Sequence, residues 1–136
     1  MEGYKRIFRY LLLYLISAPV LIIMIIGAPL FFKIWLHNSV EVPFVLHICM
    51  GAYMFSMLYA SLQMYLLNGI GKVNVQLIVY VFFAVVSIPL MNALSKAMNM
   101  YGILLVLTVV YAVQAIVGGI QIRRLLNNTA TGIWNQ

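Results

Sequence analysis

Charged side chains are rare in this chain, and acidic ones are the rarest. Of its 136 residues, 8 are Lys or Arg and 2 are Asp or Glu, which gives a net charge of +6. The two carboxylates, Glu2 and Glu41, lie outside the long apolar stretches, so none of these stretches contains the buried acid that ion-coupled transporters commonly use. Paired carboxylates and a Ser–His–acid set are also missing, and we therefore expect no enzyme activity and no catalytic residue.

Cysteine and histidine are equally scarce. The single cysteine, Cys49, excludes an intrachain disulfide and a metal cluster built from cysteines. The two histidines, His37 and His47, have no further Cys and no Asp beside them. Because protein metal sites gather three or four such ligands, we expect neither a metal nor another cofactor, and we interpret both histidines as polar groups near the membrane surface.

Long apolar runs make up most of the sequence. Hydrophobic residues account for 65% of the chain, against roughly 45–50% in ordinary soluble domains. A run of ~18 or more apolar residues is typical of a membrane-spanning helix. Four stretches contain no charged residue, namely 10–32, 42–71, 73–95 and 97–122. The sequence predicts an all-α polytopic membrane protein, a single membrane domain over 1–136, with helices at about 7–30, 43–67, 75–95 and 102–122 and a tail over 123–136.

The basic residues predict the orientation of these helices. In short loops, Lys and Arg accumulate on the cytoplasmic side of a membrane. With a cytoplasmic N-terminus, only Lys33 and Lys96 fall outside, and six basic residues fall inside: Lys5, Arg6, Arg9, Lys72, Arg123 and Arg124. We therefore expect both termini to be cytoplasmic, and we read the positive charge as a sign of topology rather than of nucleic-acid binding.

Small and weakly polar residues recur at three- and four-residue steps in the last three predicted helices. Such residues let membrane helices approach closely, and their polar side chains bond across the contact. We interpret these stripes as helix-packing faces. They comprise Ala52, Ser56, Tyr59, Ala60 and Gln63, then Gln76, Tyr80, Ala84 and Ser87, then Thr108, Tyr111, Ala112, Ala115 and Gly119.

Two short segments are more distinctive, one at 66–76 and one at 121–136. Asn68-Gly69 is a turn signal, and Gly71 permits a positive φ, so we expect a tight reversal there. We expect Lys72 to face anionic headgroups at this surface. Trp134 is expected to anchor the tail at the membrane interface.

At these segments the chain resembles the polysaccharide biosynthesis flippases, which translocate O-antigen or capsule repeat units. The resemblance rests on Asn-Gly-x-Gly-Lys at 68–72, Ile-Pro-Leu at 88–90, Tyr-Gly-Ile at 101–103 and Leu-Asn-Asn-x-Ala-Thr-Gly-Ile-Trp-Asn at 126–135. Members of this family have about twelve helices in two lobes, and the chain matches the last four. The resemblance therefore implies a fragment, a split subunit or a truncated frame, whose missing N-terminal helices or partner chain complete the transporter.

The resemblance implies that the complete transporter moves an undecaprenyl-pyrophosphate-linked oligosaccharide across the bacterial inner membrane by alternating access. The expected partners are this lipid-linked oligosaccharide and membrane lipids, with no nucleic acid. Among the polar residues, Gln63, Gln76, Asn92 and Gln114 are candidates for sugar contacts. Lys72, Arg123 and Arg124 are candidates for pyrophosphate contacts, although topology and headgroup contact also account for them.

Two other classes of protein fit the sequence. The length suits a complete four-helix carrier, either a small polyprenyl-glycan flippase or a small multidrug-resistance dimer. The latter should have an acidic residue in its first span, which this chain lacks. A membrane scaffold without transport activity also fits, and in that case all the polar stripes would be engaged in packing.

Overall fold

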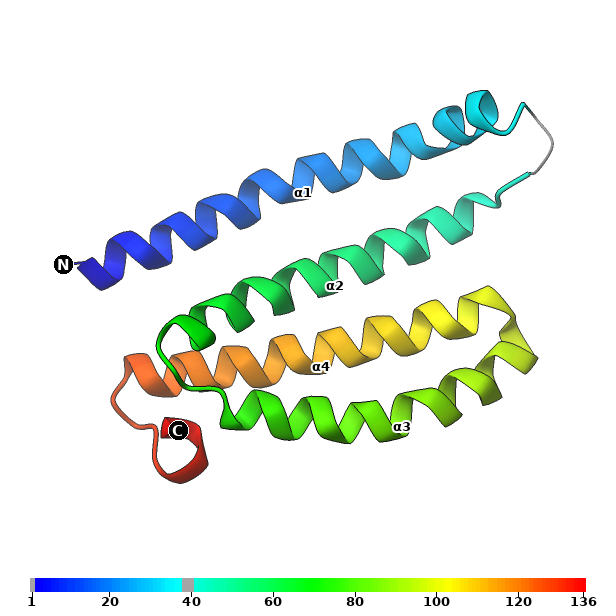
Figure 1. Ribbon diagram of the computed structural model, residues 1–136. Coiled ribbons are helices and arrows are strands. Elements are labelled where there is room, and N and C mark those ends of the chain that lie inside the picture. The colour runs from blue at the N-terminus through cyan, green and yellow to red at the C-terminus, as the bar shows by residue number, and fades with distance from the viewer. Residues whose placement is uncertain (1, 38–40) are drawn as a thin grey trace. The chain divides into compact units, whose positions relative to one another are not determined.

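The computed structural model describes residues 2–37 and 41–136, and the regular structure in this part of the chain is entirely helical. Its helices are α1 (Glu2–Trp35), α2 (Phe44–Gly69), α3 (Asn74–Met98), α4 (Met100–Leu126) and the short 3₁₀ helix η1 (Gly132–Asn135) (Figure 1). In the described residues, four helices are long and apolar enough to cross a membrane. The predicted all-α fold with four candidate membrane spans is therefore confirmed.

All four long helices extend beyond the predicted stretches at one end or both, and α2 lies at 44–69 rather than 43–67. The structure has α1 at 2–35 rather than 7–30, α3 at 74–98 rather than 75–95, and α4 at 100–126 rather than 102–122. Backbone hydrogen bonds do not depend on apolar side chains, so a helix continues past its apolar core until a turn residue ends it. Pro19 and Pro29 both lie inside α1, and the helix continues through them.

The chain divides into two compact units, one ending at Phe55 and one beginning at Ser56, and each is described by itself. Unit 1 contains α1 and the first part of α2. Gly51 is buried here, and a Cβ added to it would overlap the side chain of Ile25. The absence of a side chain at Gly51 therefore lets α1 and α2 approach closely at this point.

His47 is buried in unit 1, with only 3% of its surface exposed. Its Nδ1 lies 3.2 Å from the Pro43 carbonyl oxygen, and its ring centroid is 5.7 Å from that of Phe32. Because a carbonyl only accepts, Nδ1 is the nitrogen that carries the proton. His47 thus stabilises the first turn of α2 from within the protein.

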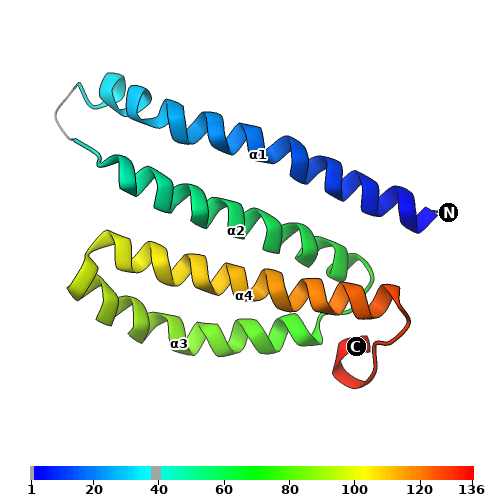
Figure 2. The same cartoon turned by 180° about the vertical axis from the view of Figure 1, so that it is seen from behind.

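Unit 2 contains the second part of α2, α3, α4 and η1. In this unit α3 and α4 run side by side and in opposite directions (Figures 1 and 2). Only Asn99, at a φ of 52°, lies between them, and its N–H bonds the Ser95 carbonyl at 2.8 Å. Gly102 follows, where a Cβ would overlap the Leu94 backbone, so this tight reversal requires glycine.

The turn between α2 and α3 has the predicted form. Gly71 has a φ of 72°, which is a conformation that favours glycine. The N–H of Gly71 bonds the Asn68 carbonyl at 3.1 Å, and that of Lys72 bonds the Leu67 carbonyl at 3.0 Å. These two bonds satisfy carbonyls at the end of α2 while the chain reverses into α3.

Small residues form much of the buried core of unit 2. Ala60, Ala115, Gly102 and Gly118 are buried, together with a few larger apolar residues. The predicted stripes are buried only in part, because Tyr59, Tyr80 and Ala84 are exposed and α4 buries Gly118 rather than Gly119. Most large apolar side chains point outward, as expected for helices whose surroundings are lipid.

Overpacking at Ala115 should destabilise unit 2. This residue is 6% exposed, so Ala115→Leu forces a larger side chain into a closed contact and should lower the free energy of unfolding by about 1–3 kcal/mol. Ala84→Leu is the matched control, because Ala84 is exposed on α3 and should change stability by less than about 0.5 kcal/mol. Unfolding by SDS in mixed micelles measures both, and equal shifts would contradict a close-packed face at Ala115.

Candidate functional site

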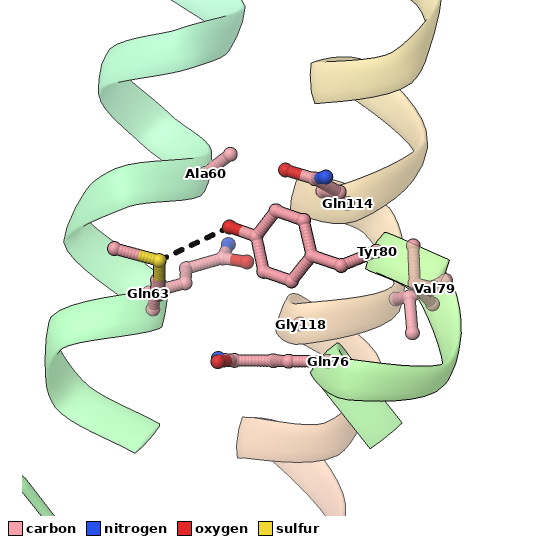
Figure 3. Close-up of a pocket in the computed structure, with 9 residues that line it drawn as sticks. Ala60, Gln63, Gln76, Val79, Tyr80, Gln114 and Gly118 are labelled. Atoms are coloured by element: carbon pink, nitrogen blue, oxygen red, sulfur yellow. Dashed lines mark hydrogen bonds between the residues drawn. The ribbon is translucent and has the colours of Figure 1, made fainter. Parts of the chain in front are cut away.

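Three glutamines that are far apart in the sequence meet in one pocket of unit 2. Gln63 extends from α2, Gln76 from the first turn of α3, and Gln114 from α4 (Figure 3). In this view the ring of Tyr80 from α3 projects over the Gln63 amide and lies below the Gln114 amide. The pocket is small and partly open to the surroundings, and its other lining residues are Ala60, Met64, Val79, Val117 and Gly118.

Gly118 makes room for the Gln63 amide. A Cβ added at Gly118 would lie 2.5 Å from Gln63 Oε1, well inside van der Waals contact. At the neighbouring Gly119, an added Cβ would lie 3.5 Å from Gln63 Nε2, which is an ordinary contact. The glycine at 118 therefore permits a long polar side chain to cross between α2 and α4 while remaining only 8% exposed.

Two amide oxygens in this pocket are buried without a hydrogen bond. Within the described residues, no donor reaches Gln63 Oε1 or Gln114 Oε1. An unsatisfied buried acceptor costs about 1–3 kcal/mol, so native proteins rarely retain one without a reason. The nearby Tyr80 hydroxyl donates instead to Met64 Sδ at 3.0 Å, although a thioether is a weak acceptor.

The lining side chains are all uncharged. The pocket offers amide oxygens and amide N–H groups next to an aromatic ring and aliphatic carbon. Such a surface binds neutral ligands that carry hydrogen-bonding groups, and it offers no compensating charge to an ion.

A second polar cluster joins the two distinctive sequence segments at one end of unit 2. Lys72 Nζ donates a short hydrogen bond to the Asn135 carbonyl, and Asn74 Nδ2 donates to Gln136 Oε1 at 3.2 Å. These bonds hold η1 against the turn between α2 and α3, and η1 also contacts α4 (Figure 2). The 68–72 and 126–135 segments, two of the four that carry the resemblance, are therefore physical neighbours.

Gln121 is the buried centre of this second cluster, and the sequence analysis did not single it out. It is 0% exposed, and its Nε2 donates to the carbonyls of Lys72 at 3.2 Å and Trp134 at 3.4 Å. One side chain thus bridges the interhelical turn and the tail. The available signal was an amide near the end of a mostly apolar helix, where a polar side chain tends to bond across a helix contact.

Trp134 and Lys72 make protein contacts that the sequence analysis did not anticipate. The Arg124 guanidinium lies 4.5 Å from the centre of the Trp134 ring, which is cation–π geometry. The Lys72 ammonium binds the tail, as described above, so part of its hydrogen-bonding capacity is used within the chain. The expected headgroup contact of Lys72 and interfacial anchoring of Trp134 therefore compete with these internal contacts.

The seven predicted substrate-contacting residues do not form one site. Gln63, Gln76 and Gln114 line the pocket, whereas Lys72 and Arg124 belong to the tail cluster. Arg123 is exposed near the end of α4. Asn92 is exposed in the second half of α3, where its backbone carbonyl accepts a bond from Ser95 Oγ at 3.1 Å.

Comparison with protein-family models, with curated proteins and with solved structures found no match to this chain. The fold defines the class: the chain has the architecture of a multi-pass membrane protein with four candidate membrane-spanning helices.

Removing the Arg124 guanidinium should loosen the tail. Arg124→Met deletes the cation–π contact, which is worth about 0.5–1 kcal/mol at an exposed site, so Trp134 should become more solvated and emit at longer wavelength. The Trp35→Phe background leaves Trp134 as the sole tryptophan. Arg123→Met is the matched control and should leave the emission unchanged. The same red shift in both variants would contradict a specific contact with Arg124.

Proposed function

We propose that this chain is part of a transporter that flips undecaprenyl-pyrophosphate-linked oligosaccharide repeat units across the bacterial inner membrane. The observation that carries the proposal is the uncharged, amide-lined pocket between helices that are apolar enough to span a membrane. A polar pocket at membrane depth is costly unless it serves a polar substrate or pathway. The resemblance of the 68–72 and 126–135 segments to polysaccharide biosynthesis flippases supplies the substrate class.

The proposed mechanism is alternating access between two helical lobes, with this chain forming part of one lobe. The sugars pass through a polar cavity while the polyprenyl tail stays in the bilayer. A pyrophosphate and several sugars need a cavity closed on all sides across ~30 Å of hydrocarbon. The open pocket of unit 2 is one wall of such a cavity, and further helices, from the same reading frame or a partner chain, supply the others.

A membrane scaffold is less well supported by the pocket. In a scaffold, the buried amides would be expected to bond across helix contacts, as Gln121 does. The oxygens of Gln63 and Gln114 lack such bonds within the described part of the chain. The oxygen of Gln121 lacks a partner as well, but Gln63 and Gln114 line a pocket and Gln121 does not, so we attribute their unpaired oxygens to a ligand.

The proposal includes cytoplasmic termini. The tail and the turn between α2 and α3 lie at the same end of unit 2, and they carry Lys72, Arg123 and Arg124, as expected for one cytoplasmic surface. In a Cys49→Ala background, Met100→Cys should react with an impermeant maleimide from the periplasmic side, and Asn127→Cys should not. Reaction of Asn127→Cys in intact spheroplasts, with Met100→Cys protected, would reverse the orientation.

Complementation tests the transport function. In a strain that lacks its repeat-unit flippase, these 136 residues alone should not restore surface polysaccharide, and co-expression with the helices encoded upstream should restore it. In the restored strain, the double variant Gln63→Leu/Gln114→Leu should reduce the polysaccharide, because leucine keeps the volume and removes the amides. Asn92→Leu, outside the pocket, is the control.

Restoration by the 136 residues alone would support a complete four-helix carrier instead. No restoration by the co-expressed helices, with both chains present in the membrane, would contradict the flippase assignment. Quantitative blotting of the polysaccharide and of the chain distinguishes lost transport from lost expression.

A further inference from the structure

We propose that the pocket lined by Gln63, Gln76, Tyr80 and Gln114 is a subsite for one uncharged sugar ring, with the oxygens of Gln63 and Gln114 accepting bonds from its hydroxyls. This inference rests on the proposed function for the identity of the molecule that carries the sugar. The inference also assigns the hydrogen bonds by which the sugar is recognised. Tyr80 and Gly118 join the residues that determine this recognition.

The unpaired atoms determine which ligand chemistry fits. Gln63 Oε1 and Gln114 Oε1 are buried acceptors without donors among the residues that the structure describes, so the ligand must bring donors. A phosphate oxygen is only an acceptor and would leave both unsatisfied. An acyl chain brings no donor either. A sugar ring carries several hydroxyls on a rigid frame and can satisfy two acceptors at once.

The uncharged lining of the pocket favours a sugar over a cationic ligand. An ammonium group also brings N–H donors, but the pocket lining contains no acidic side chain that would compensate for its desolvation. The 42–71, 73–95 and 97–122 stretches, from which the lining residues come, contain no carboxylate at all. A neutral ligand with several hydroxyls brings donors to the two amide oxygens and needs no compensating charge.

Tyr80 is the movable part of this subsite. Its ring projects over the Gln63 amide and below that of Gln114 in Figure 3, and its hydroxyl donates to Met64 Sδ, a weak acceptor. Exchanging this weak acceptor for a sugar oxygen costs little. The aromatic face also offers a flat apolar surface, which suits the C–H face of a sugar ring.

Gly118 positions the Gln63 amide, because a Cβ there would overlap Gln63 Oε1. Gly118→Ala should therefore push the amide out of place and weaken sugar binding. Gly119→Ala adds the same methyl group one residue away, where an ordinary contact is available, and it should bind like the parent.

Protection of a cysteine in the pocket tests the inference without any transport step. Val117 lines the pocket, so Val117→Cys in a Cys49→Ala background places a thiol there. The full chain is reconstituted in lipid nanodiscs, and the rate of alkylation by N-ethylmaleimide is measured. The probes are octyl β-D-glucoside and octyl β-D-galactoside. Octyl phosphate and octanol are the matched controls, because they have the same octyl group and a different polar head group.

We expect at least one glycoside to slow alkylation about threefold at twice its dissociation constant, with no effect of octyl phosphate or octanol. Gln63→Leu, Gln114→Leu and Gly118→Ala should each abolish the protection. Gly119→Ala, which is outside the pocket lining, should retain the protection and leave the rate in the absence of probe unchanged.

Equal protection by octanol would mean that the pocket holds lipid chains, and protection by octyl phosphate would mean that it holds anions. Either result overturns the inference, as does no protection by either glycoside. Failure of complementation together with sugar protection would reject the flippase function and keep the sugar site. Successful complementation without protection would keep the flippase function and reject this pocket.

Discussion

A polar group that enters the hydrocarbon core must find its hydrogen-bond partner within the protein, because lipid offers none. The helices of this chain satisfy the backbone in that way, and the few buried polar side chains face the same requirement. Gln121 meets it by bridging the Lys72 and Trp134 carbonyls with its amide nitrogen. Gln63 and Gln114 present oxygens with no partner among the described residues. Gln121 Oε1 is buried without such a partner as well, so it is the amide nitrogen, which bridges two carbonyls, that identifies Gln121 as structural.

Lipid surroundings also determine how the helices of unit 2 hold together. Apolar side chains gain little by leaving lipid for the protein interior, so close packing and hydrogen bonds must provide the stability. Gly102, Ala115 and Gly118 are buried and provide the close approach, whereas large apolar side chains of the same helix, such as Ile103 and Ile116, are exposed. Gly118 has a second role, because the space that it leaves is occupied by the Gln63 amide. Packing and the candidate site thus depend on the same residue.

The sequence predicted what depends on local chemistry and missed what depends on helix rotation. Uncharged runs predicted the four candidate spans, and Gly71 predicted the turn, since each follows from properties of adjacent residues. The sequence grouped Gln63, Gln76, Asn92 and Gln114 by side-chain chemistry alone. It could not show that the three glutamines meet and that Asn92 lies apart, because periodicity shows which residues share a face of one helix and not which faces of different helices meet. For the same reason Gly119 was expected at the packing face, and the structure buries Gly118 instead.

The tail cluster constrains how a lipid-linked substrate would be recognised under the proposed function. Lys72 and Arg124 are the basic residues whose contacts hold the tail, through the Asn135 carbonyl and the Trp134 ring. A pyrophosphate at this surface would have to share or replace these contacts, since an ammonium group has three donors and a guanidinium five. The sugar pocket carries no charge and has no such internal competitor. Sugar and anion recognition are therefore separated in this chain: the amides can bind while the tail stays docked, and anion binding at the basic residues is coupled to the position of the tail.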